Sequence, residues 1–160
     1  MITQNLLATI KRSLLNSASP IKMVDGSIQN NVTFFGSFGT SANNINDAVD
    51  YTNTDAGLHF LFGSDDTPVT IDDYKLGELV ATYQGVAMNH TTFNDYSENV
   101  FHVTRTIKNT SESPITIKEM GVFGVYGGKL FMLARTVLPT PETIEPNEMH
   151  DFAMLISLVA

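Results

Sequence analysis

The sequence has no cysteine and no tryptophan among its 160 residues. The absence of cysteine excludes disulfides, thiolate nucleophiles and cysteine metal ligands together. Basic residues are also scarce: 9 Lys and Arg stand against 17 Asp and Glu, for a formal net charge of −8. Because affinity for nucleic acid comes from cationic side chains that displace counterions from phosphates, this balance predicts no nucleic-acid partner.

Long apolar runs are absent as well. No stretch approaches the roughly 20 apolar residues that a membrane-spanning helix needs, so we expect no membrane partner. Lys11 and Arg12 follow the first apolar residues instead of preceding them, and we therefore expect a soluble protein without a cleaved leader. The chain does contain 42% hydrophobic and 16% charged residues, which suits one globular domain with a buried core.

Apolar residues repeat with helical spacing at the start of the chain. The pattern predicts an amphipathic helix from about Gln4 to Leu15, and a polar break from Asn16 to Pro20 follows it. We therefore divide the chain into an N-terminal helix or arm, residues 1–19, and a β-sandwich domain, residues 20–160. The helix docks either on its own domain or on a neighbouring subunit, and the sequence leaves both alternatives open.

From about Thr92 onward, apolar runs alternate with turn residues in the order strand, turn, strand, turn, strand, proline-rich loop, strand. Gly127-Gly128 predicts a tight turn, and Pro139 and Pro141 are expected to end the strand after it. In the last strand the apolar residues that share one face are Phe152, Met154, Ile156 and Leu158. Strands at this spacing predict a mainly β fold, an antiparallel, jelly-roll-like β-sandwich with a short N-terminal helix.

Charged residues interrupt the apolar faces of three predicted strands. Two of these strands flank the polar turn Asn109–Pro114, with Arg105 on the first and Glu119 on the second. If the two strands form a hairpin, Arg105 and Glu119 face each other as an internal ion pair that fixes the register. Arg135, on the next strand, then lies within about one residue of Glu119. The three residues form either a substrate-binding triad or a structural network, and we favour the network.

Four carboxylates surround Pro68 in one loop, where their oxygen atoms could hold a cation such as calcium. They are Asp65, Asp66, Asp72 and Asp73. Their spacing fits no EF-hand, so turn formation is the preferred interpretation, with Asp72 or Thr70 capping a helical turn through Tyr74–Leu79.

No other motif indicates chemistry. The four histidines show no paired-ligand spacing, and neither a nucleophile elbow nor a phosphate loop is present. We therefore expect no catalytic residue, no cofactor and no metal site.

A polar segment from Thr40 to Gly57 predicts a long surface loop. Loops of this length inside compact domains usually bind something, although a merely mobile loop fits the composition equally well. Together with the helix, this segment supplies the residues that we propose as a candidate interface: Leu6, Leu7, Ile10, Leu14, Ile45 and Tyr51.

Several short motifs in the second half of the chain resemble those of a group of tailed-bacteriophage virion proteins. They are FGSDDTPVTIDDYKLGELV, TRTIKNTSESPITIKEMGVFG, LARTVL and TIEPNEMHDFAMLISL, within Leu61 to Leu158. Val122 replaces the leucine common in that group, and Asn147 stands where glycine is usual. The resemblance implies a β-sandwich component of the virion, assembled in the host cytoplasm and without enzymatic activity.

The resemblance leads us to expect a head decoration, neck or collar, or tail accessory protein that forms homo-oligomers and docks on other virion proteins. The alternative is a glycan- or receptor-binding module of a phage fibre or spike. Exposed aromatic residues would serve such a module, and the candidates are Tyr51, Tyr83, Phe93 and Tyr96. A hydrolase is a third and weaker interpretation.

Overall fold

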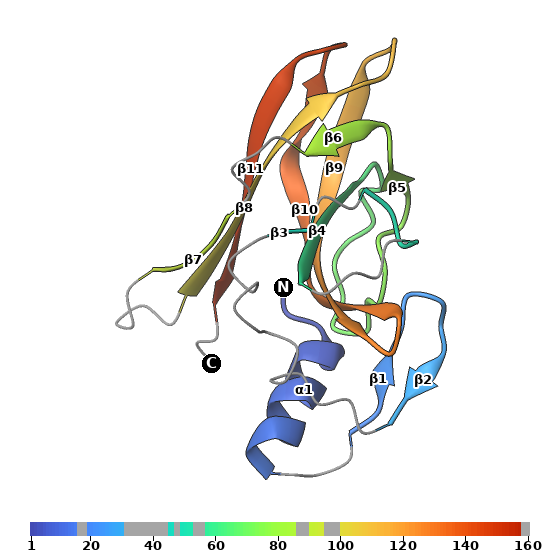
Figure 1. The fold of residues 1–160 in the computed structure, drawn as a ribbon, viewed down its shortest axis with the longest axis vertical. Helices are drawn as coiled ribbons and strands as arrows, with labels where there is room; N and C mark the ends of the chain where they lie inside the picture. Colours follow the sequence, from blue (N-terminus) through green and yellow to red (C-terminus); the bar gives the residue numbers. More distant parts are fainter. Residues whose placement is uncertain are drawn as a thin grey trace.

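The computed structural model describes residues 1–15, 19–30, 45–46, 49–52, 57–85, 90–94 and 100–157. Its first part holds α1 (Gln4–Leu15), β1 (Ile21–Lys22), β2 (Ile28–Gln29), β3 (Ile45–Asn46), β4 (Leu58–Gly63) and β5 (Leu79–Val80). The second part holds β6 (Tyr83–Gly85), β7 (His90–Asn94), β8 (Val100–Asn109), β9 (Ile115–Tyr126), β10 (Lys129–Ile144) and β11 (Met149–Ser157). The predicted mainly β, sandwich-like fold with a short N-terminal helix is confirmed (Figure 1).

The strands form two main sheets. Sheet I has the order β10-β9-β4-β3, with β5 also paired to β4; only the short β3–β4 pairing is parallel. Sheet II has the order β11-β8-β6, and β7 pairs with the other half of the same edge of β8. A separate two-stranded hairpin, β1-β2, lies beside α1 at one end of the sandwich (Figure 1).

Sheet I is covered on both faces. Every residue of β4 is buried, and the central parts of β9 and β10 are buried without alternation. The inner face packs against sheet II in the main core, whereas a second cluster consists of Leu61, Leu76, Phe123, Leu130 and Met132. Leu76 belongs to the segment 64–78, so this long connection between β4 and β5 closes the outer face of sheet I.

Sheet II has one buried and one solvated face. Along β11, Phe152, Met154 and Ile156 are buried, while the residues between them are exposed. This alternation is typical of an antiparallel sheet that covers a core on one side. The prediction that these three residues share a face is confirmed, and Leu158 lies outside the described residues.

A tight turn at Gly127-Gly128 joins β9 to β10, as predicted. Both glycines have positive φ values, 59° and 73°, which a two-residue hairpin turn between twisted strands requires. The prediction that Pro139 and Pro141 end β10 is wrong. The strand runs to Ile144, with a register shift between Val137 and Glu142, because β10 is an edge strand and proline is tolerated there.

The predicted hairpin between β8 and β9 is also wrong. The two strands are consecutive, but β8 pairs with β11, β7 and β6, whereas β9 pairs with β10 and β4. The turn Asn109–Pro114 therefore carries the chain from one sheet to the other. The buried Asn109 side chain secures this corner, since its Nδ2 donates to the carbonyl oxygens of Ser113 and Ile144, each at 2.9 Å.

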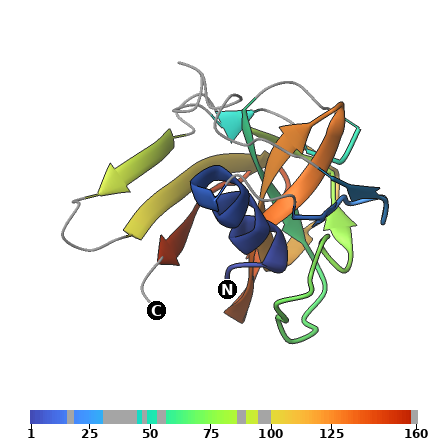
Figure 2. The same cartoon turned by 90° about the horizontal axis from the view of Figure 1, so that it is seen from below.

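The helix α1 occupies the predicted residues and docks on its own domain. Residues before it pair with β10, where the Thr3 hydroxyl donates to the carbonyl oxygen of Met132 at 2.7 Å. The Asn5 side chain bonds both the carbonyl oxygen and the amide of Lys22 in β1. Figure 2 shows the helix lying across the end of the sandwich. Among the described residues, no helix has the length and apolar character to cross a membrane.

Candidate functional site

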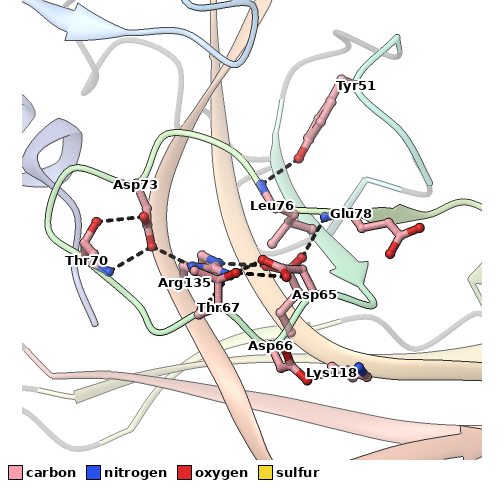
Figure 3. A network of polar contacts seen from close by, with 11 residues as sticks. Tyr51, Asp65, Asp66, Thr67, Thr70, Asp73, Leu76, Glu78, Lys118 and Arg135 are labelled. Atoms are coloured by element: carbon pink, nitrogen blue, oxygen red, sulfur yellow. Dashed lines mark hydrogen bonds and ion pairs between the residues drawn. The ribbon is translucent and has the colours of Figure 1, made fainter.

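The most polar buried region of the described chain lies where the segment 64–78 crosses the outer face of sheet I. Its centre is Arg135 of β10, whose side chain is only 4% exposed. Figure 3 shows Asp65 and Asp73 of this segment converging on the guanidinium group. The cluster, here called the Arg135 network, consists of Arg135, Glu119, Asp73, Asp65 and Thr67.

The innermost contact joins Arg135 to Glu119 of β9. Arg135 Nε donates to Glu119 Oε2 at 2.7 Å, and the Glu119 side chain is fully buried. The strand register places Arg135 opposite Gly121, two residues from Glu119, so the pair is a diagonal one on the same face. The other carboxylate oxygen, Glu119 Oε1, accepts from the Glu78 amide at 3.1 Å, which ties the end of the crossing segment to β9.

The outer contacts hold the crossing segment itself. Arg135 Nη1 donates to Asp73 Oδ2 at 2.8 Å, and Nη2 donates to the Thr67 carbonyl oxygen at 3.1 Å and to Asp65 Oδ2 at 3.4 Å. The planar guanidinium group thus reaches three separate points of the segment and β9. The hydrogen-bond donors of Arg135 therefore hold the segment 64–78 against sheet I.

The network perturbs the ionisation of its members. Burial by itself would lower the pKa of Arg135, but the hydrogen bonds that it donates to Asp73 and Glu119 outweigh burial and raise that pKa. Burial would raise the pKa of Asp73, yet its bonds with Arg135 and Thr70 hold it below the usual range. For Asp65, the hydrogen bond from the Thr67 hydroxyl is the main cause of a lowered pKa. Arg135, Asp73 and Asp65 are therefore charged near neutral pH.

Two glycines make room for the carboxylates. At Gly63, a β-carbon would lie within 3.0 Å of both the Glu119 carboxylate and the Glu78 carbonyl oxygen. At Gly77, a β-carbon would meet the Asp65 carboxylate in the same way. Neither position has a positive φ, so the close approach of side chains, and not backbone conformation, accounts for glycine here.

Tyr51 fastens another connection to the same region. Its hydroxyl oxygen accepts from the Leu76 amide at 2.8 Å, and its ring packs edge-on against Phe123 with 5.6 Å between centroids. Burial raises the pKa of the Tyr51 hydroxyl. The tyrosine that we placed in the candidate interface is therefore an internal contact of this fold.

Arg105 lies apart from the Arg135 network. It is 1% exposed in β8, opposite Phe152 of β11, and its Nη1 donates to the carbonyl oxygen of Phe60 in β4 at 2.7 Å. The predicted ion pair with Glu119 is wrong, because the two strands belong to different sheets and Glu119 pairs with Arg135. Arg105 instead links sheet II to sheet I through the core.

The carboxylates that we considered as a cation site bind groups of the protein itself. Asp65 and Asp73 hold Arg135, Asp66 pairs with Lys118 at 3.1 Å, and Asp72 accepts from the Gln4 side chain at 3.1 Å. Within the described ranges, no group of three potential ligands is arranged to hold a metal ion.

The helical turn that we predicted over Tyr74–Leu79 is wrong. The segment has no helix, and Leu79 begins the strand β5. A local loop closes instead, because the Asp73 carboxylate accepts from both the amide and the hydroxyl of Thr70.

The remaining interface candidates are scattered. Leu6 is 8% exposed and belongs to the core, Ile10 is partly buried against it, and Leu7 is 43% exposed. Ile45 lies in β3 beside β4, and its side chain, like that of Leu14, lies outside the described residues. Only Leu7 is therefore shown as an exposed apolar side chain of the predicted set.

The pattern of the sequence predicted two of the network residues, Glu119 and Arg135. It missed Asp65, Asp73 and Thr67 as their partners, although all three lie in the motif FGSDDTPVTIDDYKLGELV that carries part of the resemblance. These partners could have been predicted from the resemblance, because the acidic segment and the strands that carry Glu119 and Arg135 belong to the same set of motifs. Comparisons with family models, curated proteins and solved structures found no match to this chain.

Proposed function

We propose that this chain is a non-enzymatic structural component of a tailed-bacteriophage particle, such as a head decoration, neck or collar, or tail accessory protein. It acts by forming homo-oligomers and by docking on other virion proteins. The observation that carries the proposal is the composition of the Arg135 network. Three of the motifs that resemble virion proteins supply it: the segment Phe62–Val80, the strand containing Glu119, and the strand containing Arg135.

The network supports an architectural role because its contacts are directed inward. The guanidinium group of Arg135, on β10, binds Glu119 of β9 and the segment 64–78, and Glu119 is fully buried. Buried charges that are paired and hydrogen-bonded can specify one arrangement of the chain. The network holds the segment 64–78 in one position on the outer face of sheet I. This suits a subunit of a particle, because every copy must present the same surface to its neighbours.

The glycan-binding alternative receives less support. Of its four aromatic candidates, Tyr51 is held against Phe123 and Leu76, and Tyr83 is only 4% exposed within the core. Sugar rings stack on accessible aromatic faces, which the buried Tyr83 does not offer, while the Tyr51 ring and hydroxyl are engaged in internal contacts. The side chain of Phe93 and the whole of Tyr96 lie outside the described residues.

The proposal is tested on particles of the phage that encodes this chain. Particles are banded on a density gradient, and the copy number of the chain per particle is measured by quantitative mass spectrometry. We expect a fixed, multiple copy number and a defined density for the chain in a particle reconstruction. Absence from banded particles, with the chain present in the infected lysate, would refute the structural function.

A further inference from the structure

The strand β11 forms one edge of sheet II and offers its backbone for pairing. All nine of its residues, Met149–Ser157, pair with β8 on one side. In the part of the chain that the structure describes, no strand pairs with the other side. A row of backbone donors and acceptors at such an edge is a template for another strand.

A groove runs along this open side of the sandwich. It has a volume of about 540 Å³ and lies between β11 and β10, the edge strands of the two sheets. Its walls include Ala134, Thr136 and Leu138 on one side and Ala153, Leu155 and Ser157 on the other. No residue that lines the groove has a charged side chain.

The edge has few of the features by which soluble proteins protect such strands. β11 contains neither lysine nor proline, and its one carboxylate, Asp151, accepts from the Thr106 hydroxyl of β8 at 2.5 Å. Leu155 and Met149 are 62% and 57% exposed on its outward face. A long edge strand with exposed apolar residues and little charge is an expected site of pairing between chains.

We infer that β11 is a self-association surface on which a second copy of this chain pairs its own β11 in antiparallel orientation, joining the two copies of sheet II. The inference rests on the proposed structural function, because it names the surface through which copies associate. Two chains of net charge −8 repel each other, so two copies associate most readily through a surface that carries little charge. The groove beside β11 is such a surface, because no charged side chain lines it.

The outward side chains indicate the register. In the arrangement centred on Phe152, Met149 of each copy lies opposite Leu155 of the other, so the two exposed apolar residues cover each other. Asp151 then faces the small Ala153, and the two aspartates are not directly opposed. Cross-strand apolar pairs stabilise antiparallel pairing, and directly opposed like charges destabilise it.

Cross-linking tests this register, since the chain has no cysteine of its own. We expect Met149→Cys and Leu155→Cys proteins to form a disulfide-linked dimer when they are mixed and oxidised. Neither variant cross-links alone, because equivalent residues would lie about 20 Å apart at roughly 3.3 Å per residue. Cross-linking of either variant alone, to the same extent as the mixture, would overturn the register.

The surface itself is tested by light scattering on the full chain. We expect the wild type to give a mass twice that of the 17.5 kDa chain at micromolar concentrations, and Leu155→Lys to give the monomer mass with the circular dichroism spectrum of the folded chain. Leu7→Lys, at an exposed leucine on α1, is the matched control and should remain dimeric. A monomeric wild type, or a dimer that only Leu7→Lys disrupts, would overturn the inference. Either result leaves the particle measurement to decide the proposed function separately.

Discussion

Replacing Arg135 by methionine removes the cation around which the outer face of sheet I is closed. Methionine has a similar length and can fill the space of the aliphatic stem, so the change isolates the guanidinium group. Glu119, which is fully buried, loses its ion pair with Arg135 and keeps its hydrogen bond from the Glu78 amide. Asp73 and Asp65 lose the group that holds them to the sheet.

The expected cost follows from the burial of Glu119. Removal of one partner of a buried ion pair costs about 3–5 kcal/mol, because the other charge stays desolvated without compensation. For a chain of this size, about 1 kcal/mol lowers the melting temperature by roughly 2–4 °C. The Arg135→Met protein should therefore melt about 6–20 °C below the wild type.

Urea unfolding followed by circular dichroism measures this loss, with Lys118→Met as the control. Lys118 also joins β9 to the crossing segment through Asp66, but its side chain is 33% exposed and that of Asp66 70% exposed. Such surface pairs contribute about 0–1 kcal/mol. If Arg135→Met loses no more free energy of unfolding than Lys118→Met, the network does not stabilise the fold as argued. Adding Glu119→Gln to Arg135→Met should recover part of the loss, since it removes the uncompensated charge.

Three further changes test other contacts by thermal unfolding. Gly77→Ala should destabilise the protein by about 1–3 kcal/mol through overlap with Asp65, and the loss should shrink in an Asp65→Gly background, which removes the β-carbon as well as the carboxylate; equal losses in both would contradict the overlap. Burial would lower the pKa of His150, but its hydrogen bonds with Glu142 and Glu148 outweigh burial and raise that pKa. The contribution of His150 to the stability of the fold is therefore fully present below about pH 6.5 and is lost as the pH rises through the raised pKa. The wild type should therefore lose stability relative to His150→Gln as the pH rises above about 6.5, and parallel pH curves would refute this. Asn147 has a φ of 66°, so Asn147→Gly should preserve or raise the melting temperature, whereas Asn147→Val should lower it.

Contacts that are local in the chain were predictable from its sequence. The helix α1 follows from apolar residues at helical spacing, and the β9–β10 hairpin follows from Gly127-Gly128, because a two-residue turn places the two flanking strands side by side. The buried charges Glu119 and Arg135 then come together on one face of that hairpin. In each case the information lies within about 20 residues of chain, the range over which sequence patterns indicate structure well.

Pairing that depends on distant segments was not predictable. The turn Asn109–Pro114 is long enough either to close a hairpin or to pass between two sheets, and the choice depends on Ile144, which anchors the Asn109 side chain from 35 residues away. The same holds for the segment 64–78. Its acidic residues resemble a cation loop until Arg135, more than 60 residues later, is known to lie beneath them.

The charge balance of the Arg135 network explains why it can remain stable with one cation and three carboxylates. The fully buried carboxylate, that of Glu119, has the shortest contact with Arg135 and an additional backbone donor. The other two lie nearer the solvent, with Asp65 29% and Asp73 17% exposed, and each also accepts from a threonine of its own loop. Water screens charge at such positions much better than in the interior. The excess negative charge is thus located where it costs least, while the buried part of the network is close to neutral.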